Sequence, residues 1–216
     1  MAPTNEKTFR AAIAKGRRHL CHASPELALW IPQCGKCTWE VNWERSIFEA
    51  LVRAIAHQQL HANAANAILA RLIDAFPRRE FPSPQQIAKS PVAELRAMGF
   101  SMSKVLAIQG IAAAALAKKI PNREQCEKMS DEDIIEALTP QRGVGRWTVE
   151  MLLIFTLGRM DVMPTDDYGV RSGLMHLMRL AELPRKKGVF ADYTDSWAPF
   201  RSLGAWYLWR LADDRK

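Results

Sequence analysis

The sequence predicts an all-α protein with two helical lobes. Apolar residues recur every three or four positions through almost the whole chain, which is the period of an amphipathic helix. No segment alternates apolar and polar residues for long enough to predict a half-buried strand. Proline-rich breaks at 77–84 and at Pro121 divide the helical segments into two groups.

Nine segments are expected to be helices. In chain order they cover 46–60, 62–76, 84–88, 92–97, 101–119, 130–138, 147–157, 167–180 and 199–212. In the first, Phe48, Leu51 and Ile55 occur at i, i+3 and i+7 and so share one face. Val170 and Leu174 share a face of the eighth in the same way.

Capping residues and helix breakers indicate several helix ends. Ser101 and Ser130 are expected N-caps, and the acidic residues after Ser130 favour the positive end of a helix. Gly99 and Gly158 are expected to end the helices before them, because glycine readily adopts the left-handed conformation found there. Pro121 ends the segment that begins at Ser101.

These breaks predict three parts in one functional unit. Residues 46–120 form the first helical lobe, 121–216 form the second, and 1–45 pack back on the second lobe. The chain has 216 residues, of which 48% are hydrophobic and 25% are charged, so it is long and apolar enough to fold around a core. This composition excludes a mainly disordered chain.

The charge balance favours a polyanionic partner. Thirty Lys and Arg residues oppose 23 Asp and Glu, a net charge of +7. No apolar run approaches the roughly 20 residues of a membrane span. Residues 1–18 lack the apolar core of a secretory signal. We therefore expect an intracellular protein without a membrane contact.

The four cysteines are Cys21, Cys34, Cys37 and Cys126. Cys34 and Cys37 have the spacing of half a zinc site, and Cys21 with His22 could supply the other half. No second pair follows at zinc-finger spacing, so the pattern favours free thiols in a reducing compartment.

The stretch Gly143-Val144-Gly145 lies between two expected helices. Its glycines allow a tight turn and a close backbone approach, and Val144 would fill the core of the turn. The following helix begins with N–H groups that can bind a phosphate. Arg142 and Arg146 flank the glycines, which also suits an anion. An ordinary turn between helices remains the alternative interpretation.

Asp166 and Asp167 precede the expected helix 167–180. A carboxylate there can cap the helix by accepting hydrogen bonds from its first turn. Such a group is held in its charged form and could stabilise a positive centre beside a cleft. Capping and catalysis are therefore both open.

Taken in order, these segments resemble the helix-hairpin-helix DNA glycosylase superfamily, and within it the DNA-3-methyladenine glycosylases of alkylation repair. The sequence GVGRWT at 143–148, followed by an apolar helix and then an acid before another helix, carries the resemblance. Three further segments fit the family order: 54–65 with Gln-Gln-Leu, 95–104 with Met-Gly-Phe-Ser, and 197–209 with Trp-Ala-Pro-Phe-Arg-Ser. Together the matches cover about 46–212.

The resemblance implies a helix-hairpin-helix motif at about 134–157 and a cleft between the lobes. Asp167 would be the catalytic aspartate, with Asp166 as the alternate if the register shifts by one. The base pocket would be lined by Trp147, Met151 and Trp209. DNA-binding residues would be Gln58, Gln59, Lys104, Gly143, Val144, Gly145 and Arg146.

Finer roles follow from the same resemblance. Gln58 or Gln59 would fill the gap left by a flipped nucleotide, and the amides of the hairpin would hold a phosphate. Arg201 and Ser202 would be structural or phosphate-facing. The hairpin could also bind a monovalent cation. No other cofactor is expected, since the iron–sulfur branch needs four cysteines near the C-terminus and none follows Cys126.

The expected activity is that of a monofunctional DNA glycosylase in base excision repair. It would act as a monomer on double-stranded DNA with alkylated bases, in the cytoplasm or nucleoid if the source is bacterial. Flipped purines such as 3-methyladenine would be removed by hydrolysis, leaving an abasic site. Bifunctional relatives carry a lysine two residues after the second hairpin glycine; here Trp147 stands there, so no strand cleavage is expected.

Three alternatives are weighed against this function. A glycosylase of the same fold could act on another damaged or mismatched base, and a non-catalytic helix-hairpin-helix protein could only bind DNA. The third alternative is a zinc-dependent hydrolase. The sequence His57-Gln-Gln-Leu-His61 is similar to a zinc-binding HExxH pattern, but glutamine replaces the glutamate that acts as general base.

Overall fold

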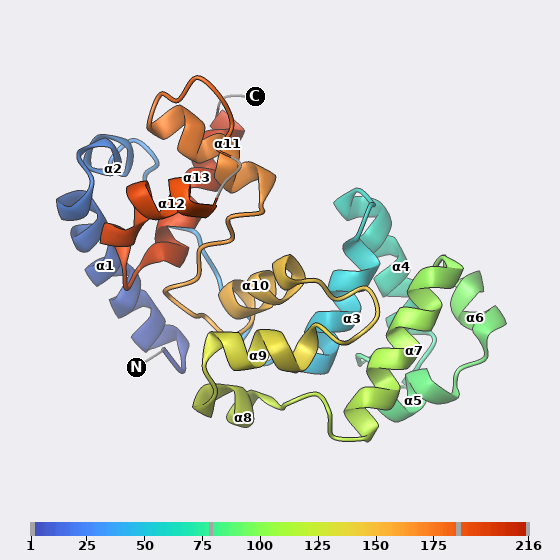
Figure 1. The fold of residues 1–216 in the computed structure, drawn as a ribbon. Coiled ribbons are helices and arrows are strands. Elements are labelled where there is room, and N and C mark those ends of the chain that lie inside the picture. Colours follow the sequence, from blue (N-terminus) through green and yellow to red (C-terminus); the bar gives the residue numbers. More distant parts are fainter. Residues whose placement is uncertain (1–2, 78–79, 185–186, 215–216) are drawn as a thin grey trace. The chain divides into compact units, whose positions relative to one another are not determined.

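The computed structural model describes residues 3–77, 80–184 and 187–214, and within these ranges the chain forms helices and loops without any strand (Figure 1). The all-α prediction is confirmed. In chain order the elements are α1 (Glu6–Ala23), α2 (Pro25–Trp30), α3 (Ile47–His57), α4 (Ala62–Asp74), α5 (Pro84–Lys89), α6 (Val92–Ala97), α7 (Met102–Leu116), α8 (Arg123–Lys128), α9 (Asp131–Leu138), α10 (Arg146–Phe155), α11 (Tyr168–Leu177), α12 (Lys187–Thr194), the 3-10 helix η2 (Asp195–Trp197) and α13 (Arg201–Asp214).

Each of the nine expected helices has a counterpart, but α1, α2, α8 and α12 were not predicted. Three of these begin with capping signals, including a capping box of Asn122 and Gln125 at the start of α8. Asn5 and Thr8 form a reciprocal capping box at the start of α1. Ser24 caps α2, with Pro25 in its first turn. Local polar signals would therefore have identified all three helices.

The predicted caps lie where expected. The Ser101 side chain accepts a hydrogen bond from the N–H of Lys104, and the Ser130 side chain accepts one from the N–H of Asp133. Gly99 and Gly158 have φ values of 106° and 66°. Both glycines therefore occupy the left-handed region that ends a helix without a side-chain clash.

Contacts divide the chain into two compact units. We call residues 1–43 with 153–216 the terminal unit, and residues 44–152 the central unit. The sequence analysis placed 121–152 with the C-terminal half, but the contacts group this segment with α3–α7. α7 ends at Leu116, before Pro121 is reached, and the chain then returns toward the helices before it.

Two contacts show this return of the chain. The Arg123 guanidinium donates to the carbonyl of Arg45 at 3.0 Å. A Cβ atom on Gly143 would lie 3.0 Å from Ile55 Cδ1 and 3.7 Å from Ala107 Cβ, so the hairpin packs on α3 and α7. The helix break at Pro121 is therefore not a boundary between the two compact units.

The core of the terminal unit depends on the close approach of α11 and α13 (Figure 1). A Cβ atom on Gly173 would lie 2.2 Å from the carbonyl oxygen of Leu208, a separation that real contacts do not reach. α1 reaches the same core, where a Cβ on Gly16 would meet Phe200 and Leu203 at 2.8 Å. Glycine is thus required where these helices meet.

The central unit is built around α3 and α7, which contact each other directly. Leu51 and Ile55 of α3 are buried, as are Ile108 and Ile111 of α7. Arg71 of α4 donates to the carbonyl of Met98 at 2.7 Å and so ties α4 to the loop after α6. No helix within the described part of the chain is both long and apolar enough to cross a membrane.

Gly173→Ala tests the packing of α11 on α13. The added methyl group must displace the Leu208 backbone, and we expect a loss of about 1–3 kcal/mol in the free energy of unfolding, as for overpacked cores. Urea unfolding followed by circular dichroism measures it. Gly110→Ala is the matched control: this exposed position in α7 has no atom within 4 Å of the new Cβ, so a gain of about 0.5–1 kcal/mol is expected. Equal effects at the two positions would contradict the packing argument.

Candidate functional site

The turn between α9 and α10 has the backbone that the glycines predicted. Gly143 has a φ of 79°, and a side chain there would press on Ile55. Val144 is 5% exposed and its N–H donates to the carbonyl of Gln141 at 3.0 Å. Gly145 faces open space. Gly143 therefore allows close packing on α3, Val144 fills the turn, and Gly145 leaves the start of α10 accessible.

The start of α10 offers main-chain donors to an anion. The first N–H groups of any helix lack partners within that helix, and the helix dipole favours a negative charge beside them. Arg146 does not add a free charge there. Its guanidinium makes two hydrogen bonds of 2.8 Å to Glu132 and one of 3.2 Å to Glu150. The bonds to Glu132 raise the pKa of Arg146.

Some main-chain carbonyls of the hairpin accept hydrogen bonds within the protein. The carbonyls of Leu138 and Gln141 accept bonds from the turn itself, and that of Gly143 accepts one from Gln58. The monovalent cation expected from the family resemblance stays a prediction. No step of the chemistry considered below requires such an ion.

The end of α3 forms a second, strongly shaped turn. Gln59 has a φ of 55°, unusual for a residue with a side chain, and is exposed. The Gln58 amide donates to the carbonyl of Gly143 at 2.8 Å. The Lys104 ammonium donates to the carbonyls of Ala56 and Gln58 at 2.8 and 2.7 Å. Two side chains therefore hold the turn that presents Gln59.

Lys104 was expected to contact a phosphate. The structure instead places its ammonium group on two carbonyls at the C-terminal end of α3, where a positive charge also interacts well with the helix dipole. Burial lowers the pKa of Lys104. Its hydrogen bonds identify it as a residue that supports the turn.

In the terminal unit, the predicted catalytic acid and one predicted pocket residue lie in contact. Asp167 is the N-cap of α11, and its Oδ1 accepts a hydrogen bond of 2.9 Å from the N–H of Val170. The same oxygen accepts one of 2.7 Å from the indole Nε1 of Trp209. A Cβ on Gly169 would lie 2.7 Å from the Trp209 ring, so this glycine allows the indole to reach the acid.

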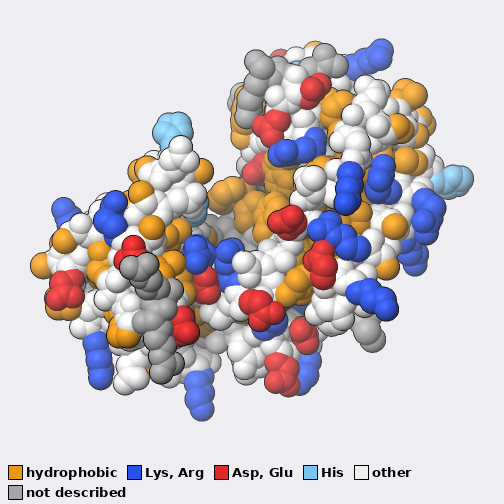
Figure 2. Space-filling model, turned by 180° about the vertical axis from the view of Figure 1, so that it is seen from behind, with side chains coloured by type: hydrophobic (Ala, Val, Ile, Leu, Met, Phe, Trp, Pro, Cys, Tyr) orange, Lys and Arg blue, Asp and Glu red, His pale blue; other side chains and the backbone are white. Residues whose placement is uncertain are grey.

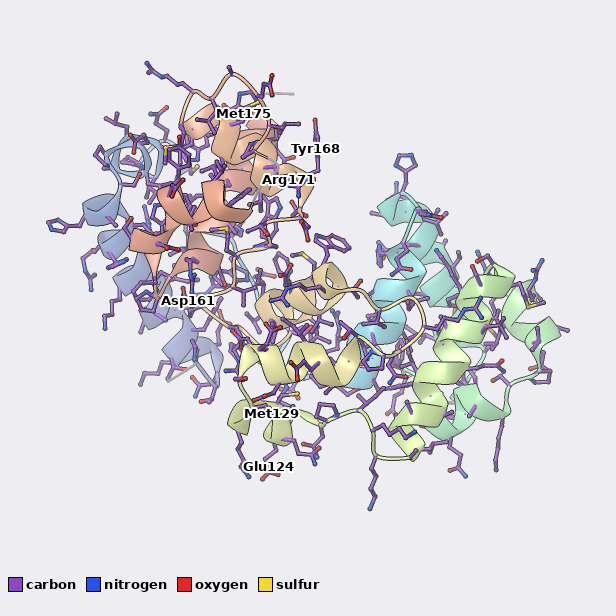
Figure 3. The ribbon with its side chains drawn as sticks, viewed as in Figure 1. Glu124, Met129, Asp161, Tyr168, Arg171 and Met175 are labelled. Atoms are coloured by element: carbon purple, nitrogen blue, oxygen red, sulfur yellow. The ribbon has the colours of Figure 1, made fainter. Side chains whose placement is uncertain are left out.

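The neighbouring acid has a different environment. Asp166 is exposed, and its Oδ1 accepts a bond of 2.9 Å from Arg171, whose Nε also donates to the carbonyl of Thr165 at 2.7 Å. Figure 3 labels Tyr168 and Arg171 at the same end of α11, with Met175 further along the helix. Arg171 thus fastens the loop that leads into Asp167, a role that the sequence analysis missed.

Arg201 and Ser202 hold the same loop region from the start of α13. The Arg201 guanidinium binds Asp161 through two bonds of 2.8 and 2.9 Å, and these bonds raise the pKa of Arg201. The buried Ser202 hydroxyl accepts a bond from the N–H of Val162 and donates one to its carbonyl. Of the two roles expected for this pair, the structure shows the structural one. Asp161 was missed, because an isolated acid carries no sequence pattern.

Trp147 and Met151 both lie on α10, in the central unit. Trp147 is 44% exposed, which is unusual for such a large apolar side chain, and Met151 is half-buried. Their accessibility is consistent with contact to a bound base.

Neither candidate metal pattern forms a site among the described residues, which contain no group of three or more His, Cys, Asp or Glu side chains able to hold an ion. α3 ends at His57 and His61 precedes α4, so the two histidines do not share a helix as HExxH requires. Burial, with nearby Arg53 and Lys104, lowers the pKa of His57. Cys34 and Cys37 are free thiols, and burial raises the pKa of Cys34 to about 11.

Comparisons with known proteins show which family the chain resembles. Residues 52–199 match the family described as "HhH-GPD superfamily base excision DNA repair protein". "DNA-3-methyladenine glycosylase 1" of Schizosaccharomyces pombe is 46% identical over 172 residues, which cover 78% of this chain and 75% of that protein. "Alkylbase DNA glycosidase-like protein mag2" of the same yeast is 36% identical over 198 residues, covering 91% and 92%.

A solved structure shows the same fold. The 3-methyladenine DNA glycosylase Mag1 of Schizosaccharomyces pombe, in complex with abasic DNA, superposes with a TM-score of 0.80 at 39% sequence identity. The superposition covers 91% of this chain and 95% of that chain.

Lys104→Met tests the support of the α3 turn. Methionine keeps the length and apolar stem of the side chain but leaves the carbonyls of Ala56 and Gln58 without their donor. We expect the free energy of unfolding to fall by about 1–3 kcal/mol. Lys119→Met is the matched control, because Lys119 is exposed and makes no side-chain bond with a described residue; its effect should stay within about 0.5 kcal/mol. Denaturant unfolding compares the two, and equal losses would exclude the proposed support.

Proposed function

The chain belongs to the HhH-GPD superfamily of base excision DNA repair proteins, and from this membership we infer that it is a monofunctional DNA glycosylase for alkylated purines. It would release bases such as 3-methyladenine from double-stranded DNA and leave an abasic site. The observation that carries the proposal is Asp167, held at the N-terminus of α11 by Val170 and Trp209. The relatives named for this activity and the Mag1 complex with abasic DNA support the same substrate class.

Cleavage of the glycosidic bond of an alkylated purine requires mainly a correctly placed negative charge from the protein. A purine alkylated on its ring carries a positive charge, so the base leaves as a neutral molecule and needs no general acid. The sugar gains oxocarbenium character as the glycosidic bond breaks. A fixed carboxylate below the sugar stabilises that charge, and a preorganised group does so without reorientation during the reaction. Asp167 supplies this carboxylate.

Trp209 contributes by orienting the acid. Its indole N–H and the N–H of Val170 both bind Oδ1 of Asp167, which restricts rotation of the carboxylate. We assign Trp209 this orienting role in addition to the pocket role expected from the family resemblance. Trp147 and Met151 are the proposed contacts to the flipped base, because a cationic purine binds well against an aromatic face.

Of the two candidates for filling the gap in the duplex, we favour Gln59. The side chain of Gln58 is already bonded to Gly143, whereas Gln59 is exposed on a backbone of positive φ. In this proposal Gln58 and Lys104 support the turn. The main-chain N–H groups from Gly143 to Gly145 and into α10 bind the phosphate.

The proposed role of Asp167 is tested by base release from methylated duplex DNA. Asp167→Asn keeps the shape of the side chain but removes the charge, so we expect the single-turnover rate to fall by about 10²-fold or more. Asp166→Asn is the matched control, since it changes the same side chain one residue earlier, where the acid is exposed and paired with Arg171. It should keep most of the wild-type rate. Equal rates for wild type and Asp167→Asn would refute the assignment.

Borohydride trapping tests the monofunctional reaction. A lyase forms a Schiff base between an amine and the opened sugar, and Trp147 occupies the position where bifunctional relatives carry the lysine. We expect no protein–DNA adduct on denaturing gels and no strand cleavage without alkali. A trapped complex would contradict hydrolysis by water alone.

A further inference from the structure

The positive charge of the chain is concentrated on α1. This helix of 18 residues contains five basic residues and one acidic residue, a net charge of +4, whereas the whole chain carries +7. The basic residues are Lys7, Arg10, Lys15, Arg17 and Arg18. Figure 2 shows Lys and Arg side chains gathered over the body of the molecule that contains α1. More than half of the net charge therefore belongs to one element outside the site described above.

The charges face solvent along one side of the helix. The buried side of α1 consists of Phe9, Ile13, Gly16 and Leu20. The opposite side is exposed and consists of Lys7, Ala11, Ala14, Lys15, Arg18 and His22. At about 100° per residue, these six positions lie within an arc of roughly 100°. The two alanines lie between the basic side chains and leave room for a close approach by another backbone.

Three of the basic side chains of α1 have no partner in the described part of the protein, although two others do. Arg10 donates to Glu6 and to the carbonyl of Trp39, and Arg17 is half-buried. By contrast, Lys7, Lys15 and Arg18 make no hydrogen bond or ion pair with any other described residue. Nothing in the fold of the terminal unit requires them.

The cations near the proposed DNA site of the central unit differ from those of α1 in their pairing. Two of the three cationic side chains first expected at the DNA site are engaged inside the protein: Arg146 binds Glu132 and Glu150, and Lys104 binds two carbonyls. The third, Arg142, is exposed beside the hairpin. Affinity for duplex DNA comes largely from cations that replace the counterions of its phosphates. The hairpin can position a phosphate through its N–H groups, but two acids offset the charge of Arg146, and two carbonyls occupy the donors of Lys104.

We propose that the exposed face of α1, consisting of Lys7, Lys15, Arg18 and His22, is a second contact surface for the phosphate backbone of DNA. Lys7 and Arg18 are eleven residues apart, about 16 Å along the helix, a length over which DNA presents a charge about every 1.7 Å. The contact is independent of sequence, because it involves no base edge. It rests on the proposed DNA-repair function and adds a second site to it.

The test is the salt dependence of binding to an undamaged duplex. Lys15→Gln combined with Arg18→Gln removes two charges from the face while keeping long polar side chains. Fluorescence anisotropy between about 50 and 200 mM salt gives the slope of log K against log salt concentration, which should become less steep by about 1 to 2. Thermal unfolding of the same variant checks that α1 still folds.

Lys118→Gln combined with Lys119→Gln is the matched control. It also removes two neighbouring, exposed and unpaired lysines, but at the end of α7, and its slope should equal that of the wild type. An unchanged slope for the α1 variant, or an equal decrease in the control, would overturn the proposal while leaving the glycosylase assignment intact. Failure of the wild type to bind DNA at all would overturn both.

Discussion

The hydrogen bond from Trp209 to Asp167 is the interaction on which the terminal unit depends. The acid and the indole are 42 residues apart, and they meet because α13 lies directly against α11. That approach requires Gly173, where any side chain would meet the backbone of Leu208, and Gly169, where one would meet the indole. Gly169 and Gly173 therefore allow Trp209 of α13 to come close enough to form a hydrogen bond with the carboxylate of Asp167.

In the central unit, a side-chain amide likewise joins two segments that are far apart in the sequence. Gln58 and Gly143 are 85 residues apart, yet the amide of the first binds the carbonyl of the second at 2.8 Å. The positive φ of Gly143 and its missing side chain bring the hairpin onto Ile55 of α3. The turn between α9 and α10 and the turn that presents Gln59 are thus parts of one packed structure, so a shift of either turn would move the other.

Sequence reasoning found the helices with an apolar period, the caps at Ser101 and Ser130, and the segments that resemble a known family. These features are local, so a short window of residues contains them. It did not find the partners of Trp209 and Gln58, because these contacts join segments 42 and 85 residues apart. The boundary near 120 failed for the same reason: proline reports where a helix ends, but the packing of the following segment depends on surfaces far away in the chain.

The distribution of charge follows from these contacts. A residue that orients a catalytic or binding group must itself be immobilised, and an arginine or lysine is immobilised by pairing it with acids or carbonyls. Arg146 and Arg201 are held by acids that offset their charge, whereas Lys104 keeps its charge but has its donors engaged by two carbonyls. Attraction of a polyanion needs the opposite property, mobile and unpaired cations on an open face. Because one side chain cannot serve both purposes well, we expect cations that attract DNA to lie mainly among the unpaired ones, and the exposed cations of α1 are the proposed example.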